Sequence, residues 1–253
     1  SNINELDDKF YYYGLYLSFT IPLIALSFLY LKKIIKKSVR KSVHLRKLYL
    51  VTAKSFFFTQ IILFLMNSTN DILFNVVGDK TLINYQYGFR IFSISVIFSA
   101  VISTVIWSNL GSKLREHYQL INGSSLGIYF VALFVLNCLL ILITNPFMTI
   151  FFELDIMITS MQLFSLALMS TLLGFIFILT GFLNCLNIID KQVFVLFSGL
   201  AVKFVLIYLV VNLFGEIDFV VVFCNIVSYL IIVIVYCTYL IKAAKIERGI
   251  ASV

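Results

Sequence analysis

Continuous apolar runs of about 20 residues dominate the sequence, and they restrict its fold more than any other feature. Short polar or basic segments separate seven such runs. A run of this length crosses a bilayer as an α-helix, because a helix rises about 1.5 Å per residue and the hydrocarbon core is about 30 Å thick. The runs do not alternate apolar and polar residues, as the strands of an outer-membrane barrel would. We expect an all-α polytopic membrane protein with about seven transmembrane helices.

Composition supports this class. The chain is 61% hydrophobic and 12% charged, whereas soluble domains are about 45–50% apolar and about 25% charged. The sequence begins at Ser1 and shows no signal-peptide pattern. We therefore expect a fragment or a processed chain whose upstream spans are missing.

The pattern of the runs predicts where the spans lie. Spanning helices are expected at residues 10–31, 55–77, 85–110, 126–144, 156–184, 193–213 and 219–241. Pro22 is expected to kink the first helix, because proline lacks the backbone donor and clashes with the preceding turn. Pro146 is expected in the turn that follows the fourth helix.

Lysine and arginine are distributed unequally between alternate loops. With the 32–54 segment in the cytoplasm, fifteen of the nineteen basic residues are cytoplasmic, and only Lys9 and Lys80 lie outside. The positive-inside rule then predicts an external N-terminus and a cytoplasmic C-terminus. The net charge of +7 follows from this topology and predicts no nucleic-acid partner.

The most basic segment, Lys32 to Lys47, has apolar residues at helical spacing on one face. That pattern is typical of a helix lying on an anionic membrane surface. Calmodulin-type or nucleic-acid binding also fits so basic a run. The apolar spans that flank it closely favour the membrane surface.

No pattern of catalytic or metal-binding residues is present. The four cysteines lie in or at the ends of apolar runs without metal-ligand spacing, and the two histidines lie in polar segments. Nucleophile-elbow, P-loop, dinucleotide-binding and HExxH motifs are all missing from the sequence. We therefore expect no enzyme activity, no metal and no cofactor.

Two opposite charges lie inside neighbouring runs. Asp71 lies seven residues before Gly78, and Arg90 lies six residues after Asn84. If the Gly78–Asn84 turn joins antiparallel spans, both side chains lie roughly 10 Å below the same membrane surface. Charges in lipid are usually paired, turned inward and functional. Asp71 is therefore a candidate ion-pair or ion-coupling residue.

Amides and a lysine add to the polar content of the spans. Asn67 and Asn70 are candidates for substrate binding, although hydrogen bonding between helices is the simpler interpretation. Lys203 lies about 15 Å into its span, and we expect it to face a central cavity. The alternative is a lysine hydrogen-bonded within the helices, to a carbonyl, Asn184 or Asn225. Separately, serines at 95, 99 and 103 form a small-residue stripe that predicts close helix packing.

Several short motifs resemble those of a known family. They are Asn70-Asp71, Val77-Gly78, Tyr85-x-Tyr87 with Arg90-Ile91-Phe92, Gly181-Phe182-Leu183-Asn184, Asp190-Lys191, Lys203-Phe204 and Phe214-Gly215. Over residues 55–241 the chain resembles the C-terminal half of a polysaccharide flippase of the O-antigen (Wzx) type. That type belongs to the MATE-like multidrug/oligosaccharidyl-lipid/polysaccharide exporter superfamily.

The resemblance implies a two-lobed transporter. Residues 1–31 would then hold the last helix of the N-terminal lobe, residues 32–54 a cytoplasmic linker, and residues 55–253 the six-helix C-terminal lobe. The missing N-terminal lobe of the same polypeptide would be its partner, in the bacterial cytoplasmic (inner) membrane. Its substrate would be a lipid-linked oligosaccharide of the undecaprenyl-diphosphate type, used for surface polysaccharide such as O-antigen or lipopolysaccharide.

The expected site follows from this substrate. Arg90 and Lys203 would bind the diphosphate, and Asn67 and Asn70 would also bind the substrate. Asp71 would hold Arg90 or carry a coupling proton or sodium ion. Two alternatives remain open. A cation-coupled multidrug exporter of the same superfamily would have an acidic cavity, and a membrane glycosyltransferase or polymerase would need a large loop carrying carboxylates.

Overall fold

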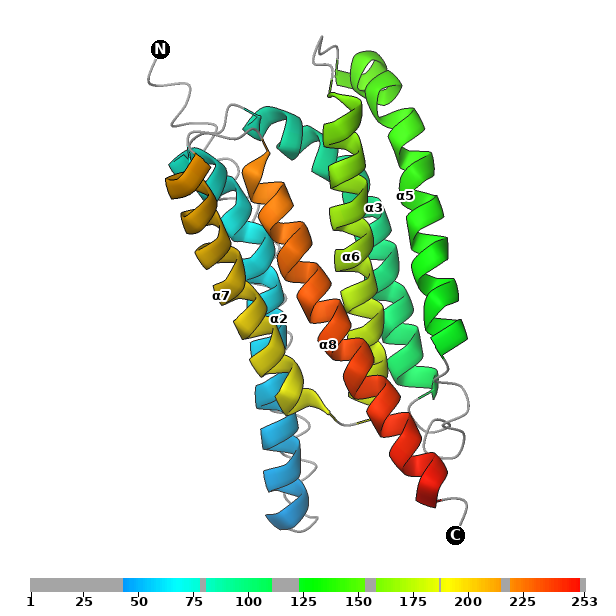
Figure 1. Cartoon of the computed structure of the whole chain (residues 1–253). Helices are drawn as coiled ribbons and strands as arrows, with labels where there is room; N and C mark the ends of the chain where they lie inside the picture. The colour runs from blue at the N-terminus through cyan, green and yellow to red at the C-terminus, as the bar shows by residue number, and fades with distance from the viewer. Residues whose placement is uncertain are drawn as a thin grey trace. The chain divides into compact units, whose positions relative to one another are not determined.

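The computed structural model describes residues 43–77, 81–110, 123–152, 158–186, 188–214 and 219–250 (Figure 1). The chain divides into two units, Ser1–Lys54 and Ser55–Val253, and only residues 43–54 of the first are described. Those residues are helical. The predicted span at 10–31 and the Lys32–Ser42 part of the basic segment lie outside the described residues.

The described chain consists of six long helices and one short π-helix. They are α2 (Val43–Val77), α3 (Leu82–Val105), η1 (Ile106–Leu110), α5 (Gly123–Phe152), α6 (Ser160–Cys185), α7 (Ile189–Phe214) and α8 (Val220–Ile250). The six long helices all contain stretches long and apolar enough to cross a membrane. The protein is therefore an all-α, multi-pass membrane protein, as the apolar runs predicted.

Several helices extend beyond their predicted ends. Helix α2 begins at Val43, inside the segment predicted as a linker, because the sequence between Val43 and Ser55 contains no glycine or proline. Helix α5 continues through Pro146 to Phe152, so the turn predicted at Pro146 is wrong. Membrane helices tolerate proline because neighbouring groups satisfy the freed backbone carbonyl.

Helix α6 forms the centre of the second unit. It packs against α3, α5 and α8, and nearly all of its span is buried, whereas α3, α5 and α7 remain largely exposed. Figure 1 shows α6 between α8 on one side and the α3–α5 pair on the other. Exposed apolar surface on the outer helices is what a bilayer would cover.

Small residues bring α3 and α6 together. A Cβ atom added at Gly174 would lie 2.6 Å from the Ser99 hydroxyl oxygen, and one at Gly181 would lie 2.8 Å from the Ser103 carbonyl oxygen. Distances this short leave no room for a methyl group. The predicted close-packing role of the serine stripe is confirmed, and it fixes the α3–α6 contact.

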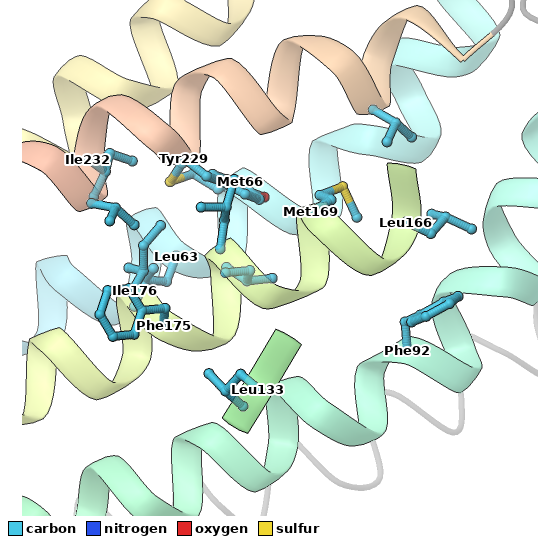
Figure 2. Packing of buried hydrophobic residues seen from close by; sticks show 14 of the residues in the cluster. Leu63, Met66, Phe92, Leu133, Leu166, Met169, Phe175, Ile176, Tyr229 and Ile232 are labelled. Atoms are coloured by element: carbon cyan, nitrogen blue, oxygen red, sulfur yellow. The ribbon is translucent and has the colours of Figure 1, made fainter. Parts of the chain in front are cut away.

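A buried polar network crosses the same layer. The Ser95 hydroxyl donates to the Asn137 amide oxygen at 2.8 Å, and the Asn137 amide nitrogen donates to the Thr171 hydroxyl at 3.0 Å. These bonds link α3, α5 and α6. Around them lies an apolar core to which α2, α3, α5, α6 and α8 contribute the side chains labelled in Figure 2. The core and the network make these helices a framework for the polar residues of α2.

Candidate functional site: polar side chains within the apolar spans

Helix α2 carries polar residues on two different faces. Asn70 is fully buried, and Thr69 beside it is half-buried. Exposed polar side chains lie at Gln60, Ser68, Asp71 and Asn75, and Asn67 is half-buried between the two groups. The inner group and the outer group have different partners, so each forms a separate candidate site.

The inner group surrounds Lys203, which lies near the middle of α7 and is 0% exposed. Its ammonium donates hydrogen bonds to the Met66 carbonyl oxygen at 2.8 Å, the Thr69 hydroxyl at 3.0 Å and the Asn70 amide oxygen. All three acceptors belong to one turn of α2. Lys203 therefore ties α7 to α2 inside the bundle.

Asn70 extends this contact to two more helices. Its amide oxygen also accepts a hydrogen bond from the Asn225 amide nitrogen of α8, at 3.0 Å. Its own amide nitrogen donates to the Tyr85 hydroxyl of α3, at 2.7 Å. The ring of Tyr85 stacks on Phe74, with centroids 4.7 Å apart. Four helices thus meet at Asn70, and we call Lys203, Thr69, Asn70, Asn225 and Tyr85 the lysine cluster.

The cavity-facing orientation predicted for Lys203 is wrong. The ammonium is sealed inside the bundle, and its partners are a carbonyl and polar side chains, as in the alternative interpretation. Asn225 takes part only through Asn70, and Asn184 instead accepts a hydrogen bond from Gln192 at 3.0 Å. Sequence could not place Lys203, because residues 66–70 and 203 become neighbours only when α2 and α7 pack. Its assignment to substrate binding stays a prediction, now without the exposed position that motivated it.

The outer group joins α2 to the start of α3. Asp71 and Arg90 are both exposed, and the Asp71 carboxylate lies within electrostatic reach of Arg90 and close to the side chain of Gln86. The Arg90 guanidinium lies 5.3 Å from the centroid of the Tyr87 ring, a cation–π distance. We call Asp71, Gln86, Tyr87 and Arg90 the charged patch.

Both charges of the patch lie within helices of the apolar bundle. Asp71 precedes the end of α2 at Val77 by six residues, and Arg90 follows the start of α3 at Leu82 by eight. At about 1.5 Å per residue, they lie roughly 9–12 Å inside their helices. No site role was predicted for Gln86 or Tyr87, although Gln86 is four residues before Arg90 and therefore on the same face.

The hydrogen bonds of Asn67 go to residues outside both groups. It donates to the Leu63 carbonyl at 3.3 Å and accepts from the Tyr229 hydroxyl at 3.4 Å. It remains half-buried, so part of its side chain stays accessible. Of the two candidate amides, Asn67 is therefore the better placed for a ligand, because Asn70 is enclosed by the lysine cluster.

Metal-ligating residues do not gather in the part of the chain that the structure describes: no group of three or more His, Cys, Asp or Glu side chains is found there. Comparison with known proteins adds no further assignment, since no family model, no curated protein and no solved structure matches the chain. Within the described residues, the geometry defines a helical bundle of membrane-spanning length that contains the buried Lys203 cluster and the exposed charged patch.

Proposed function

We propose that this chain is one lobe of a transporter that flips a lipid-linked oligosaccharide across the bacterial cytoplasmic membrane. The observation that supports this function is the exposed charged patch, Asp71 with Gln86 and Arg90, inside otherwise apolar spans. A charged side chain facing lipid is costly, by about 2.5–3.5 kcal/mol on insertion scales where it lies at the bilayer centre. Asp71 and Arg90 lie within their spans though not at the centre, and a face that carries both charges is better suited to a water-filled passage than to lipid.

The chemistry of the patch fits an anionic, sugar-bearing head group. The planar guanidinium of Arg90 can bind a diphosphate through two parallel hydrogen bonds, which a lysine cannot do. Tyr87 orients that guanidinium, and Gln86 and Asn67 offer amides for sugar hydroxyls. Asp71 would hold Arg90 in the empty state and release it when phosphate binds, so that the arginine is never left uncompensated.

The remaining parts of the proposal follow from the topology expected from the sequence. The substrate would be an undecaprenyl-diphosphate oligosaccharide destined for surface polysaccharide, and it would pass between this lobe and an N-terminal lobe. The start of this chain would be external and its C-terminus cytoplasmic. A proton or sodium ion carried by Asp71 would couple transport to an ion gradient.

A transport assay tests the proposal. Full-length protein is reconstituted in proteoliposomes that contain undecaprenyl-diphosphate oligosaccharide, and the fraction that reaches the opposite leaflet is measured with a membrane-impermeant lectin. Arg90→Ala should lower the initial rate by about 10–150-fold, the range expected for hydrogen bonds to a charged group. Lys191→Ala is the matched control, because Lys191 also lies 5.5 Å from an aromatic centroid, that of Tyr239, but outside the patch.

The same assay can reject the proposal. An Arg90→Ala rate equal to that of Lys191→Ala would remove the patch from the transport path. A separate dye-efflux measurement gives the other outcome. If Arg90→Ala abolished the efflux of a cationic dye but left lipid flipping undiminished, the multidrug exporter would be favoured.

A further inference from the structure

The Lys203 ammonium has a binding site made of three oxygen atoms from one turn of α2. They are the carbonyl oxygen of Met66, the hydroxyl oxygen of Thr69 and the amide oxygen of Asn70. None of them carries a formal charge. An ammonium has three donors and no acceptor, so three oxygens match its full hydrogen-bonding capacity.

The neighbouring bonds commit all three oxygens to accept. The Thr69 hydroxyl gives its own proton to the Leu65 carbonyl at 2.7 Å, so toward Lys203 it can only accept. The orientation of the Asn70 amide is set by its nitrogen, which donates to the Tyr85 hydroxyl at 2.7 Å. A carbonyl such as that of Met66 can only accept. The site is therefore complementary to a cation that presents three N–H groups.

A further oxygen lies beside this site. Asn225 donates from its amide nitrogen to the Asn70 oxygen, and its own amide oxygen is buried without a hydrogen-bond partner among the described residues. Buried acceptors without a donor are uncommon and costly. The junction of α2, α7 and α8 thus holds one buried acceptor that no described donor satisfies, in addition to the three oxygens that bind Lys203.

From this geometry we propose that α2 builds a binding site for a primary ammonium ion, and that Lys203 is its tethered occupant. The chain supplies its own cation at the point where α2, α7 and α8 meet, so closure of these helices needs no dissolved ion. A free alkylammonium ion would occupy the same oxygens if the lysine side chain were removed. This inference is independent of the proposed transport, because it concerns the interior of the bundle and not the charged patch.

Chemical rescue tests the site in the purified full-length protein. Lys203→Ala keeps Cβ and removes three carbons and the nitrogen, which together make n-propylammonium. Unfolding can be followed with a thiol-reactive dye, because Cys185 and Cys224 are buried free thiols. The variant should lose about 6–20 °C in Tm. Added n-propylammonium chloride should then restore about 3–6 °C when present at ten times its Kd.

The controls separate a built site from a general effect of salt. Lys203→Met fills the space of the stem without an N–H group, so n-propylammonium should leave its Tm unchanged. Tetramethylammonium has no N–H donor, 1-propanol has no charge, and sodium has neither stem nor donor, so none should rescue Lys203→Ala. The inference is overturned if n-propylammonium fails to stabilise Lys203→Ala, if it stabilises Lys203→Met equally, or if any of the three controls rescues as well.

A second variant pair decides the question if Lys203→Ala yields no folded protein. Thr69→Val keeps the shape of the side chain and removes one of the three oxygens, while the lysine stays in place. Its Tm should fall by about 3–12 °C, as expected when a hydrogen bond to a charged group is lost. Ser68→Ala, an exposed neighbour on the same helix, should leave Tm unchanged. Equal Tm values for the two variants would refute the oxygen site.

Discussion

The ammonium of Lys203 on α7 donates a hydrogen bond to the side-chain amide oxygen of Asn70 on α2, and both residues are 0% exposed. A buried charge requires such partners, because transfer of an unpaired ammonium from water into an apolar interior costs many kcal/mol. The contact joins segments 133 residues apart in the sequence. It explains how an apolar bundle accommodates a lysine near the middle of a membrane helix.

Removal of the Asn70 amide should destabilise the bundle strongly. Asn70→Ala leaves Lys203, Asn225 and Tyr85 without the partner that they share. We expect the free energy of unfolding to fall by about 3–5 kcal/mol, the usual cost of removing a partner of a buried charge. Denaturant unfolding in detergent, monitored by fluorescence, would measure it.

A charged replacement at the same position provides the complementary test. Asn70→Asp keeps the acceptors for Lys203 and adds a countercharge, and the Tyr85 hydroxyl can turn to donate to it. This variant should be more stable than Asn70→Ala. If Asn70→Ala and Asn70→Asp lowered the free energy of unfolding equally, the Lys203 ammonium would not depend on its contact with Asn70.

The charged patch should behave as a coupled unit in transport. Arg90→Ala should damage transport more than Arg90→Lys, because lysine keeps the charge but not the two-pronged geometry. Asp71→Asn removes the countercharge near the arginine. Rates of the two single variants and of the Asp71→Asn/Arg90→Ala double variant would be compared in full-length protein. If the double variant lost only the sum of the two single losses in transition-state free energy, Asp71 and Arg90 would act independently.

Close packing of α3 on α6 should make Gly181 intolerant of any side chain. A Cβ there would lie 2.8 Å from the backbone oxygen of Ser103, and a backbone atom cannot move aside as a side chain can. Gly181→Ala should therefore cost about 1–3 kcal/mol, the range for overpacking. Gly127→Ala is the matched control, because nothing lies within 4 Å of its added Cβ. Thermal unfolding of both variants would check the difference, and equal Tm values would contradict the packing.

The topology of the loops can be read by labelling. The distribution of basic residues predicts that cysteines introduced in the Gly78–Asn84 and Phe214–Asp218 turns react with an impermeant reagent from outside intact cells. A cysteine at Ser38, in the basic segment, should react only after the membrane is opened. Labelling of the Ser38 position in intact cells would reverse the predicted orientation.

Sequence alone determined the class of this protein and the approximate positions of the six described spans. Apolar runs of spanning length have one physical solution in a bilayer, because a helix satisfies its own backbone groups without water. The existence of the six described helices could therefore be predicted from the sequence. Their exact ends could not be predicted. Pro146, expected in a turn, lies within α5, because tertiary contacts decide whether a membrane helix tolerates a proline.

The similar depth of Asp71 and Arg90 could be predicted from sequence, because a short turn between antiparallel helices fixes their relative position, and their pairing stays a prediction. Lys203 could not be placed in this way. Its acceptors on α2 belong to a distant segment, and periodicity predicts depth in the membrane but not which helices become neighbours. Only the packing of α7 and α8 against α2 decided that this lysine is enclosed by oxygen atoms while Arg90 stays exposed.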